Sequence, residues 1–277
     1  MNGDCFINNS FSKFIEIKGK DSTNFLQGLI TNDINECKVD NPIYACLLTP
    51  QGKFLADFFI IQIIDKYLVE IHEKYFEMFI SKLKMYKLRA IVDFSINESI
   101  SSIIFFAKEL QKIPKDIISF QDPRHPNIGQ KLFINKNNLK KINKFKELDF
   151  KKYKEILMKN LVPYTPDDLI ENQSLLLENN FHNINAISWE KGCFVGQEIT
   201  ARMKYRSLLK KQIYALEILS GNINPGDYII QKNINIGSVI SKTGQYVLCM
   251  LKINLIKNKS LNKEKIKTDS NALLKFL

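Results

Sequence analysis

The chain has 277 residues, of which 45% are hydrophobic and 25% are charged. This balance is typical of a globular protein with a hydrophobic core, and it excludes disordered and fibrous chains. The longest uncharged apolar stretch, residues 58–64, is too short to cross a bilayer, and the first residues lack the basic-then-apolar layout of a signal peptide. We therefore expect a cytoplasmic protein without a membrane partner.

The charge balance is strongly basic. The chain has 40 basic and 29 acidic residues and a net charge of +11, which would attract polyanions such as tRNA. Nearly all of the excess is lysine, in a chain also rich in Ile and Asn. Since a genome rich in A and T drifts toward these residues, basicity alone supports a tRNA partner weakly.

The same bias makes the arginines informative. Only four are present, Arg89, Arg124, Arg202 and Arg206. A lysine would serve wherever charge alone is needed, so we expect these guanidinium groups to be used for their planar fork of donors, which grips a carboxylate or phosphate with two bonds. Arg202 and Arg206 are four residues apart and would share one face of a helix. A solvated helix face is the alternative for both.

Cysteine usage points to a reducing compartment. The chain has five cysteines, which form no CxxC pair and leave one over in any disulfide scheme. A resident cluster usually takes four cysteines, and the three histidines have no ligand spacing, so the sequence predicts no metal site. Any iron–sulfur cluster would have to be shared with another protein.

Strand-like and helix-like segments alternate in the first part of the chain. Residues 11–19 predict a strand, and residues 21–34 predict a helix with an Asp or Ser cap. A hairpin over residues 43–63, with its turn at 50–53, precedes a strand at 67–72. A helix over 73–89 and a strand starting in 90–99 follow. This order predicts an α+β fold with helices covering antiparallel sheets.

The second part changes texture. Residues 121–129 predict a loop, and the lysine-rich residues 134–157 predict a partly helical, solvated segment. Beyond Ser207, short alternating strands are separated by turns at 224–227 and 242–245, which predicts a small β-barrel or sandwich. We therefore expect a region 1–206, formed by one or two interleaved subdomains, and a C-terminal barrel over 207–277.

The segment KGCFVGQE, residues 191–198, carries the clearest chemical signal. A nearby cation and a helix N-terminus both favour thiolate over thiol, and Lys191 and the helix-like run after Gly196 could supply both to Cys193. Gly192 and Gly196 let a ligand or another backbone come close. The alternative for Cys193 is a buried residue that only fills space.

Several motifs, in order along the chain, resemble the YgfZ family of folate-binding proteins, relatives of the aminomethyltransferase T protein of glycine cleavage. The signature is KGCFVGQEITARMKYR, residues 191–206, with Phe194 where tyrosine is usual and Ser207 where a glycine often follows. The other matching motifs, which span most of the chain, are FLQGLITNDI (25–34), LLTPQGKFLADF (47–58), YKLRA (86–90), DPRHPNIG (122–129) and LLLENN (175–180).

The resemblance implies a three-part fold around a cavity of folate size, a tetrahydrofolate ligand, and a role in making or repairing iron–sulfur proteins, including those that modify tRNA. A pterin suits a carboxylate such as Glu178, and the anionic glutamate tail suits a cation such as Arg202. Gly196, Gln197 and Glu198 of the signature are assigned to the same cofactor. A plain surface carboxylate is the alternative for Glu178.

Three functions follow from this reading. The first is a folate-binding accessory factor whose partners are cluster-assembly or client proteins, with Cys193 as a transient cluster ligand, a sulfur or one-carbon acceptor, or a redox thiol. The second is a folate-dependent aminomethyl or one-carbon transferase. T proteins carry an acidic pair where this chain has Ala56 and Asp57, so Asp57 alone would serve as the acid, unless it is an exposed strand residue. The third is a tRNA-binding module.

Overall fold

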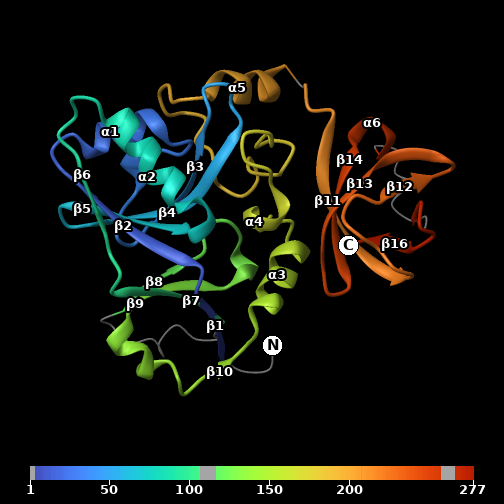
Figure 1. Cartoon of the computed structure of the whole chain (residues 1–277), viewed down its shortest axis with the longest axis horizontal. Coiled ribbons are helices and arrows are strands. Elements are labelled where there is room, and N and C mark those ends of the chain that lie inside the picture. Colours follow the sequence, from blue (N-terminus) through green and yellow to red (C-terminus); the bar gives the residue numbers. More distant parts are fainter. Residues whose placement is uncertain (1–3, 107–116, 207, 257–265) are drawn as a thin grey trace.

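The computed structural model describes residues 4–106, 117–206, 208–256 and 266–277. Its strands form two five-stranded sheets and a closed barrel. In Figure 1 the two sheets occupy the left side of the molecule, the barrel lies on the right, and helices α3 and α4 lie between them. The expected α+β class with a small C-terminal barrel is confirmed.

The first sheet is antiparallel throughout, in the order β3-β4-β5-β2-β6. The sequence predicted all of its members, which are β2 (Ser12–Lys18), β3 (Ile43–Leu48), β4 (Phe54–Ile63), β5 (Lys66–His72) and β6 (Asp93–Ile96).

Successive side chains of β4 point to opposite faces of this sheet. Phe58 packs on Phe79 of α2 (Glu73–Lys87), with ring centroids 4.7 Å apart. Ala56 is on the same face as Phe58 and is fully buried. Asp57 and Phe59 therefore point to the other face, toward the second sheet.

Helix α1 (Ser22–Leu29) is shorter than predicted, because the backbone becomes extended at Ile30. Asp21 occupies the N-cap position, but its side chain makes no capping bond. Its carboxylate instead accepts a hydrogen bond from the backbone N–H of Ile91 at 2.7 Å. A short 3₁₀ turn, η1 (Ile34–Glu36), follows.

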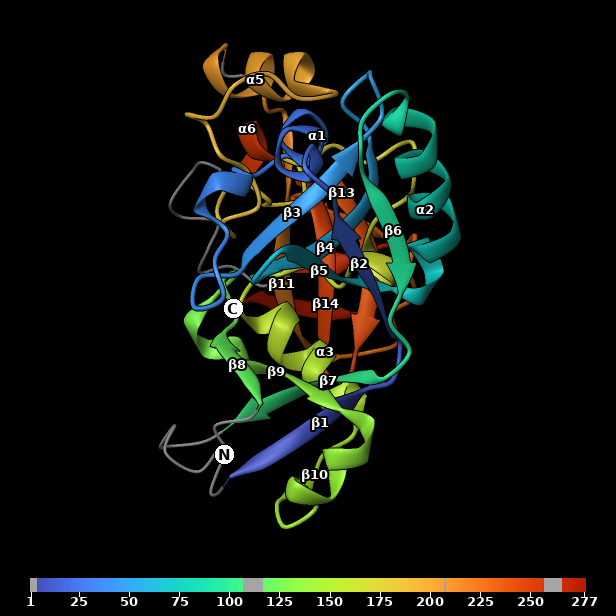
Figure 2. The same cartoon turned by 90° about the vertical axis from the view of Figure 1, so that its left-hand side faces the viewer.

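The second sheet has the order β10-β1-β7-β9-β8 and is visible below the first in Figure 2. Its pairs are antiparallel except β1 with β10. The strands and their 3₁₀ turns are β1 (Cys5–Asn9), β7 (Ile100–Phe106), β8 (Ile118–Gln121), η3 (Pro126–Ile128), β9 (Gln130–Asn135), η4 (Lys136–Lys141) and β10 (Lys146–Glu147).

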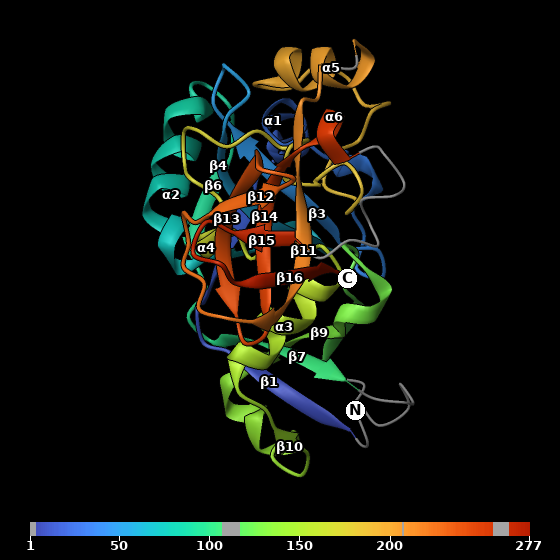
Figure 3. The same cartoon turned by 90° about the vertical axis from the view of Figure 1, so that its right-hand side faces the viewer.

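The barrel closes in the order β11-β14-β13-β12-β15-β16, and Figure 3 views it from its own side. Its first strand begins at Lys211, and Ser207, where we placed the start of the C-terminal domain, lies outside the described residues. The elements are β11 (Lys211–Ser220), β12 (Tyr228–Gln231), β13 (Ile234–Thr243), β14 (Tyr246–Lys252), α6 (Ile253–Ile256), β15 (Ile266–Thr268) and β16 (Leu273–Phe276).

The barrel packs on α3 (Phe150–Lys159) and α4 (Thr165–Asp168). Met158 of α3 forms a buried cluster with Ile213 and Leu248 of the barrel. Beside this cluster, Ser241 donates a 2.5 Å hydrogen bond to the buried carboxylate of Asp168. Burial raises the pKa of Asp168 to about 6, against the hydrogen bonds that favour its charged form.

Among the described residues, no helix has both the length and the apolar character needed to span a membrane.

Candidate functional site

Residues 188–196, which we call the Cys193 loop, lie against the end of α1. The backbone N–H of Ser188 donates to the carbonyl of Thr31 at 3.0 Å, and that of Val195 donates to the carbonyl of Gly28 at 3.0 Å. These two bonds fix the loop on either side of Cys193.

Lys191 fixes the middle of the loop. Its side chain is buried, and Nζ donates to the carbonyl oxygens of Gln27, Ile30 and Asn32 at 2.7–2.8 Å. A helix leaves its last carbonyls without intrahelical partners, and an ammonium has three hydrogens to donate, so these groups satisfy one another. Burial lowers the pKa of Lys191 to about 8. We predicted this charge beside Cys193, but its hydrogen bonds go to the end of α1.

Gly196 is needed for close packing. Its φ of 82° lies in the left-handed region, and a Cβ at this position would lie 2.4 Å from the carbonyl oxygen of Thr49 in the β3–β4 turn. We predicted that either a ligand or another part of the backbone comes close to this glycine, and in the structure it is the backbone of Thr49. Gly192 differs, because a Cβ there would meet no described atom within 4 Å.

Cys193 is exposed, whereas the other four cysteines are buried. It lies three residues before Gly196, which is the N-cap of α5 (Gln197–Tyr205). The space-filling alternative for Cys193 is therefore wrong, and the thiol is presented to solvent by a loop that is fixed on both sides.

The remaining signature residues lie on α5, at the upper end of the molecule in Figure 1. Arg202 pairs with Glu198 at 2.5 Å, and both side chains are more than half exposed. Gln197, in the first turn, is half-buried. Of the three residues that we assigned to the cofactor here, Glu198 and Arg202 form part of an exposed helix surface.

Glu178 faces the barrel. Its side chain is mostly buried, and a carboxylate oxygen lies 3.4 Å from Nζ of Lys211 on β11. Its backbone carbonyl accepts a hydrogen bond from the N–H of Ile213 at 2.9 Å. Glu178 therefore connects the segment before the Cys193 loop to the barrel.

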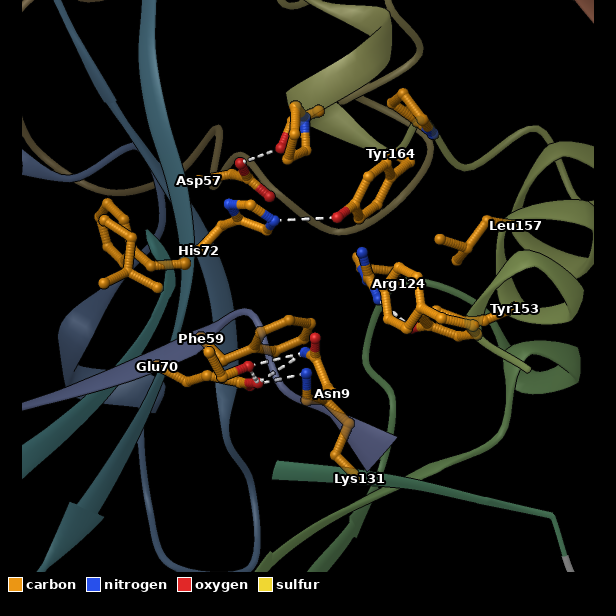
Figure 4. Close-up of a pocket in the computed structure, with 17 residues that line it drawn as sticks. Asn9, Asp57, Phe59, Glu70, His72, Arg124, Lys131, Tyr153, Leu157 and Tyr164 are labelled. Atoms are coloured by element: carbon orange, nitrogen blue, oxygen red, sulfur yellow. Dashed lines mark hydrogen bonds and ion pairs between the residues drawn. The ribbon is translucent and has the colours of Figure 1, made fainter. Parts of the chain in front are cut away.

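A cavity of about 60 Å³ lies between the first sheet, the second sheet and α3 (Figure 4). Of the residues predicted for catalysis or cofactor binding, Asp57 alone lines it. The lining residues are Asn9, Ser12, Asp57, Phe58, Phe59, Glu70, Ile71, His72, Arg124, Lys131, Phe150, Tyr153, Leu157, Pro163, Tyr164, Thr165 and Pro166.

Asp57 is held by two hydroxyl groups. Tyr44 donates to one carboxylate oxygen at 2.7 Å and Thr165 donates to the other at 2.5 Å. Next to it, His72 Nδ1 accepts from the backbone N–H of Lys74, so Nε2 carries the proton and donates to the Tyr164 hydroxyl at 2.9 Å. Burial lowers the pKa of His72, which keeps the ring neutral.

Arg124 occupies one wall of the cavity. Its guanidinium makes two bonds to the carboxylate of Asp122, at 2.7 and 3.0 Å, and a third to the Tyr153 hydroxyl at 2.7 Å. Its faces are covered by the rings of Phe59 and Tyr44, with centroids 4.8 and 5.2 Å from the guanidinium carbon. This is the planar, two-bond use that we predicted for the arginines, applied to an internal carboxylate.

A second buried ion pair closes the lower side in Figure 4. Lys131 lies 2.6 Å from Glu70, and both side chains are 3% exposed. Asn9 and Ser12 donate to the other oxygen of Glu70 at 3.3 and 2.6 Å. The charged groups of this wall are thus paired with one another.

As it stands, the cavity beside Asp57 is too small for a whole tetrahydrofolate molecule, and the folate ligand stays a prediction. Ligand pockets generally measure about 300–1,000 Å³, and the volume beside Asp57 is about 60 Å³. If Arg124 moved out of the wall, the buried carboxylate of Asp122 would lose its cation. Glu178 and Arg202 are not among the residues that line the cavity. We derive no chemical step through folate.

Sequence reasoning missed Arg124, His72, Tyr164 and the Glu70–Lys131 pair as neighbours of Asp57. Arg124 carried a signal, since it is one of four arginines in a lysine-rich chain. The others carried none, because their proximity depends on how two sheets and α4 pack.

No group of three or more His, Cys, Asp or Glu side chains in the described residues is arranged to hold a metal ion. Any cluster that reaches Cys193 would need further ligands from another molecule.

No protein-family model matches the chain. Curated relatives include the "Iron-sulfur cluster assembly factor IBA57 homolog, mitochondrial" of Coccidioides immitis (26% identical, 74% of this chain, 54% of the relative) and that of Dictyostelium discoideum (25%, 76% and 62%). "Iron-sulfur cluster assembly factor IBA57, mitochondrial" of Mus musculus is 22% identical over 74% of this chain and 63% of its own. The chain thus spans just over half of these relatives' length. The names of these relatives say mitochondrial, so the cytoplasmic location that we expect for this protein stays a prediction.

The fold has a solved counterpart. The structure of glycine cleavage system aminomethyltransferase T from Bartonella henselae matches with a TM-score of 0.78 over 98% of this chain and 84% of that chain, at 11% identity. The chain therefore has the aminomethyltransferase T fold.

Proposed function

We propose that this chain is an accessory protein of the YgfZ type that takes part in iron–sulfur cluster assembly or repair, and that Cys193 is the group that touches the cluster. The names of its relatives support the process. The observation that carries the assignment is an exposed thiol on a loop held by backbone bonds on both sides and by Lys191 beneath it.

The cluster is cargo in this proposal. A thiol loses its proton when it binds iron, and a cluster is generally held by four thiolates or by thiolates with histidines. Cys193 offers one ligand, and no other described side chain completes a metal-binding group with it. The remaining ligands therefore belong to the partner that carries the cluster, and Cys193 binds it transiently.

Cells that depend on this chain test the proposal. Cys193→Ser is expected to abolish its support of cluster-containing enzymes, including a tRNA-modifying one, without lowering the unfolding temperature, because the side chain is exposed. Glu190→Gln, another exposed position nearby, is the matched control and is expected to behave as wild type. Full enzyme activity with Cys193→Ser would refute the role of the thiol.

Tetrahydrofolate binding and aminomethyl transfer stay predictions. Asp57 lines a cavity, but its volume of about 60 Å³ is below that of ordinary ligand pockets. Calorimetry with tetrahydrofolate tests the first of these predictions, and a saturable binding heat from the wild-type protein would support it.

A further inference from the structure

An aromatic and cationic patch lies beside the Cys193 loop. We define the α5 patch as Trp189, Arg202, Lys204, Tyr205, Arg206 and Leu208. Tyr205 is 68% exposed and Leu208 is 50% exposed. The three cationic residues are also exposed.

The patch is ordered internally. Nζ of Lys204 lies 3.9 Å from the centroid of the Trp189 ring, and the Tyr205 ring meets the edge of Trp189 at 6.4 Å. Cys193 lies four residues after Trp189 and four before Gln197, the first residue of α5. Along the chain, the exposed thiol therefore lies between Trp189 and the helix that carries most of the other patch residues.

Composition and charge favour a protein partner. Tyr, Trp and Arg are the residues enriched at the centres of protein interfaces. From Gln197 to Lys210 the chain has four basic residues and one acidic residue, Glu198, which is paired with Arg202. An exposed ion pair of this kind contributes little to stability, so Arg202 can exchange Glu198 for another carboxylate.

We propose that the α5 patch is a docking surface for an acidic protein that carries the cluster. The inference rests on the proposed function, since it names the surface by which that protein brings its cluster to Cys193. Cationic residues would steer the encounter, and Tyr205 and Leu208 would provide the apolar contact. Thiolate ligands add negative charge to a cluster site, and this charge is complementary to the positive charge of the patch.

A nucleic acid fits the patch less well. Non-specific single-strand binding stacks bases on open aromatic faces. Here Lys204 covers Trp189 and also lies 5.3 Å from the Tyr205 centroid. The rings are thus engaged by a cation of the same helix.

Binding to an acidic plant-type [2Fe–2S] ferredoxin, used as the probe, tests the proposal by biolayer interferometry at low salt, with unfractionated tRNA measured in parallel. Lys204→Glu with Arg206→Glu is expected to weaken ferredoxin binding at least about tenfold. The matched control is Lys136→Glu with Lys140→Glu, which makes the same charge change at exposed positions beside β9, at the opposite end of the molecule in Figure 1. It is expected to stay within about twofold of wild type.

Tyr205→Ser, which leaves the charge unchanged, is expected to weaken binding about fivefold and separates docking from general attraction. Equal losses in both charge variants, no ferredoxin binding, or tighter binding of tRNA that is lost in the patch variant would each overturn the proposal. Cys193→Ser is expected to keep ferredoxin binding. If Cys193→Ser binds ferredoxin but does not support cluster-containing enzymes in cells, both the docking surface and the role of the thiol are supported. If the wild-type protein does not bind ferredoxin, the docking proposal fails, but the role of Cys193 is unaffected.

Discussion

The cavity beside Asp57 and the surface around Cys193 use the same kinds of side chain in opposite ways. In the cavity, Arg124 and Lys131 are buried and each is paired with a carboxylate of its own chain. On α5, the cations are exposed, and Arg202 pairs only with an exposed neighbour. Groups that are already satisfied hold a fold together, whereas groups with exposed donors remain available to a partner.

This comparison predicts that substitutions in the cavity cost stability and that substitutions around Cys193 cost function.

Arg124→Ala should have the largest effect on stability. It leaves the buried carboxylate of Asp122 without its cation, and breaking a buried pair from one side costs about 3–5 kcal/mol. Urea unfolding measures this loss. Asp122→Asn combined with Arg124→Leu should recover much of it, because no unpaired charge remains. A loss below about 1 kcal/mol for the single variant would show that the wall is loosely held.

Lys191→Met should follow. The change removes three hydrogen bonds to backbone carbonyls and leaves those acceptors in a mostly buried site. We expect a loss of roughly 3 kcal/mol, at about 1 kcal/mol for each bond. Hydrogen exchange at the amide of Val195 should accelerate as the loop is released. Lys210→Met, at an exposed position, is the control and should change neither quantity.

The burial of the Asp168 carboxylate should make stability depend on pH. Burial raises the pKa of Asp168 from 3.8 to about 6 in the folded protein. The folded state therefore binds this proton more tightly than the unfolded state, so the contribution is favourable at low pH and is lost as the pH rises from about 4 to 6. Its size is on the order of 3 kcal/mol, at about 1.4 kcal/mol for each pKa unit. In Asp168→Asn this part of the slope should vanish from unfolding curves measured across the window.

Alanine substitutions at the two glycines of the loop should differ in how much they lower stability. Gly196→Ala places a methyl group against Thr49 at a positive φ, and we expect about 2 kcal/mol of destabilisation. Gly192→Ala meets nothing and should stay within about 0.5 kcal/mol. Thermal unfolding of both variants checks the difference, and equal melting temperatures would contradict the packing role of Gly196.

Local patterns predicted most of the elements. The alternation of β2 and β5, the turn in the β3–β4 hairpin and the periodicity of α2 were all readable, because each depends on residues close in sequence. The end of α1 was not, since the chain leaves the helix at Ile30 to pair with Leu47 of β3. Long-range pairing overrode local propensity there.

The candidate site was predictable only in part. Cys193 was found because its glycines and neighbouring cation are adjacent in sequence. The neighbours of Asp57 come from strands, loops and helices far apart along the chain, and their pairing is decided by packing.

By itself, the sequence determined the fold class and the small C-terminal barrel, because hydrophobic periodicity and turn residues act over short distances. It singled out Cys193 by its glycines and neighbouring cation, and the structure showed that this thiol is exposed. Tertiary structure alone decided that Lys191 binds the end of α1, that Arg124 fills the cavity wall, and that Glu178 faces the barrel. A charged side chain takes the partner that burial brings within reach, and burial is a property of the whole fold.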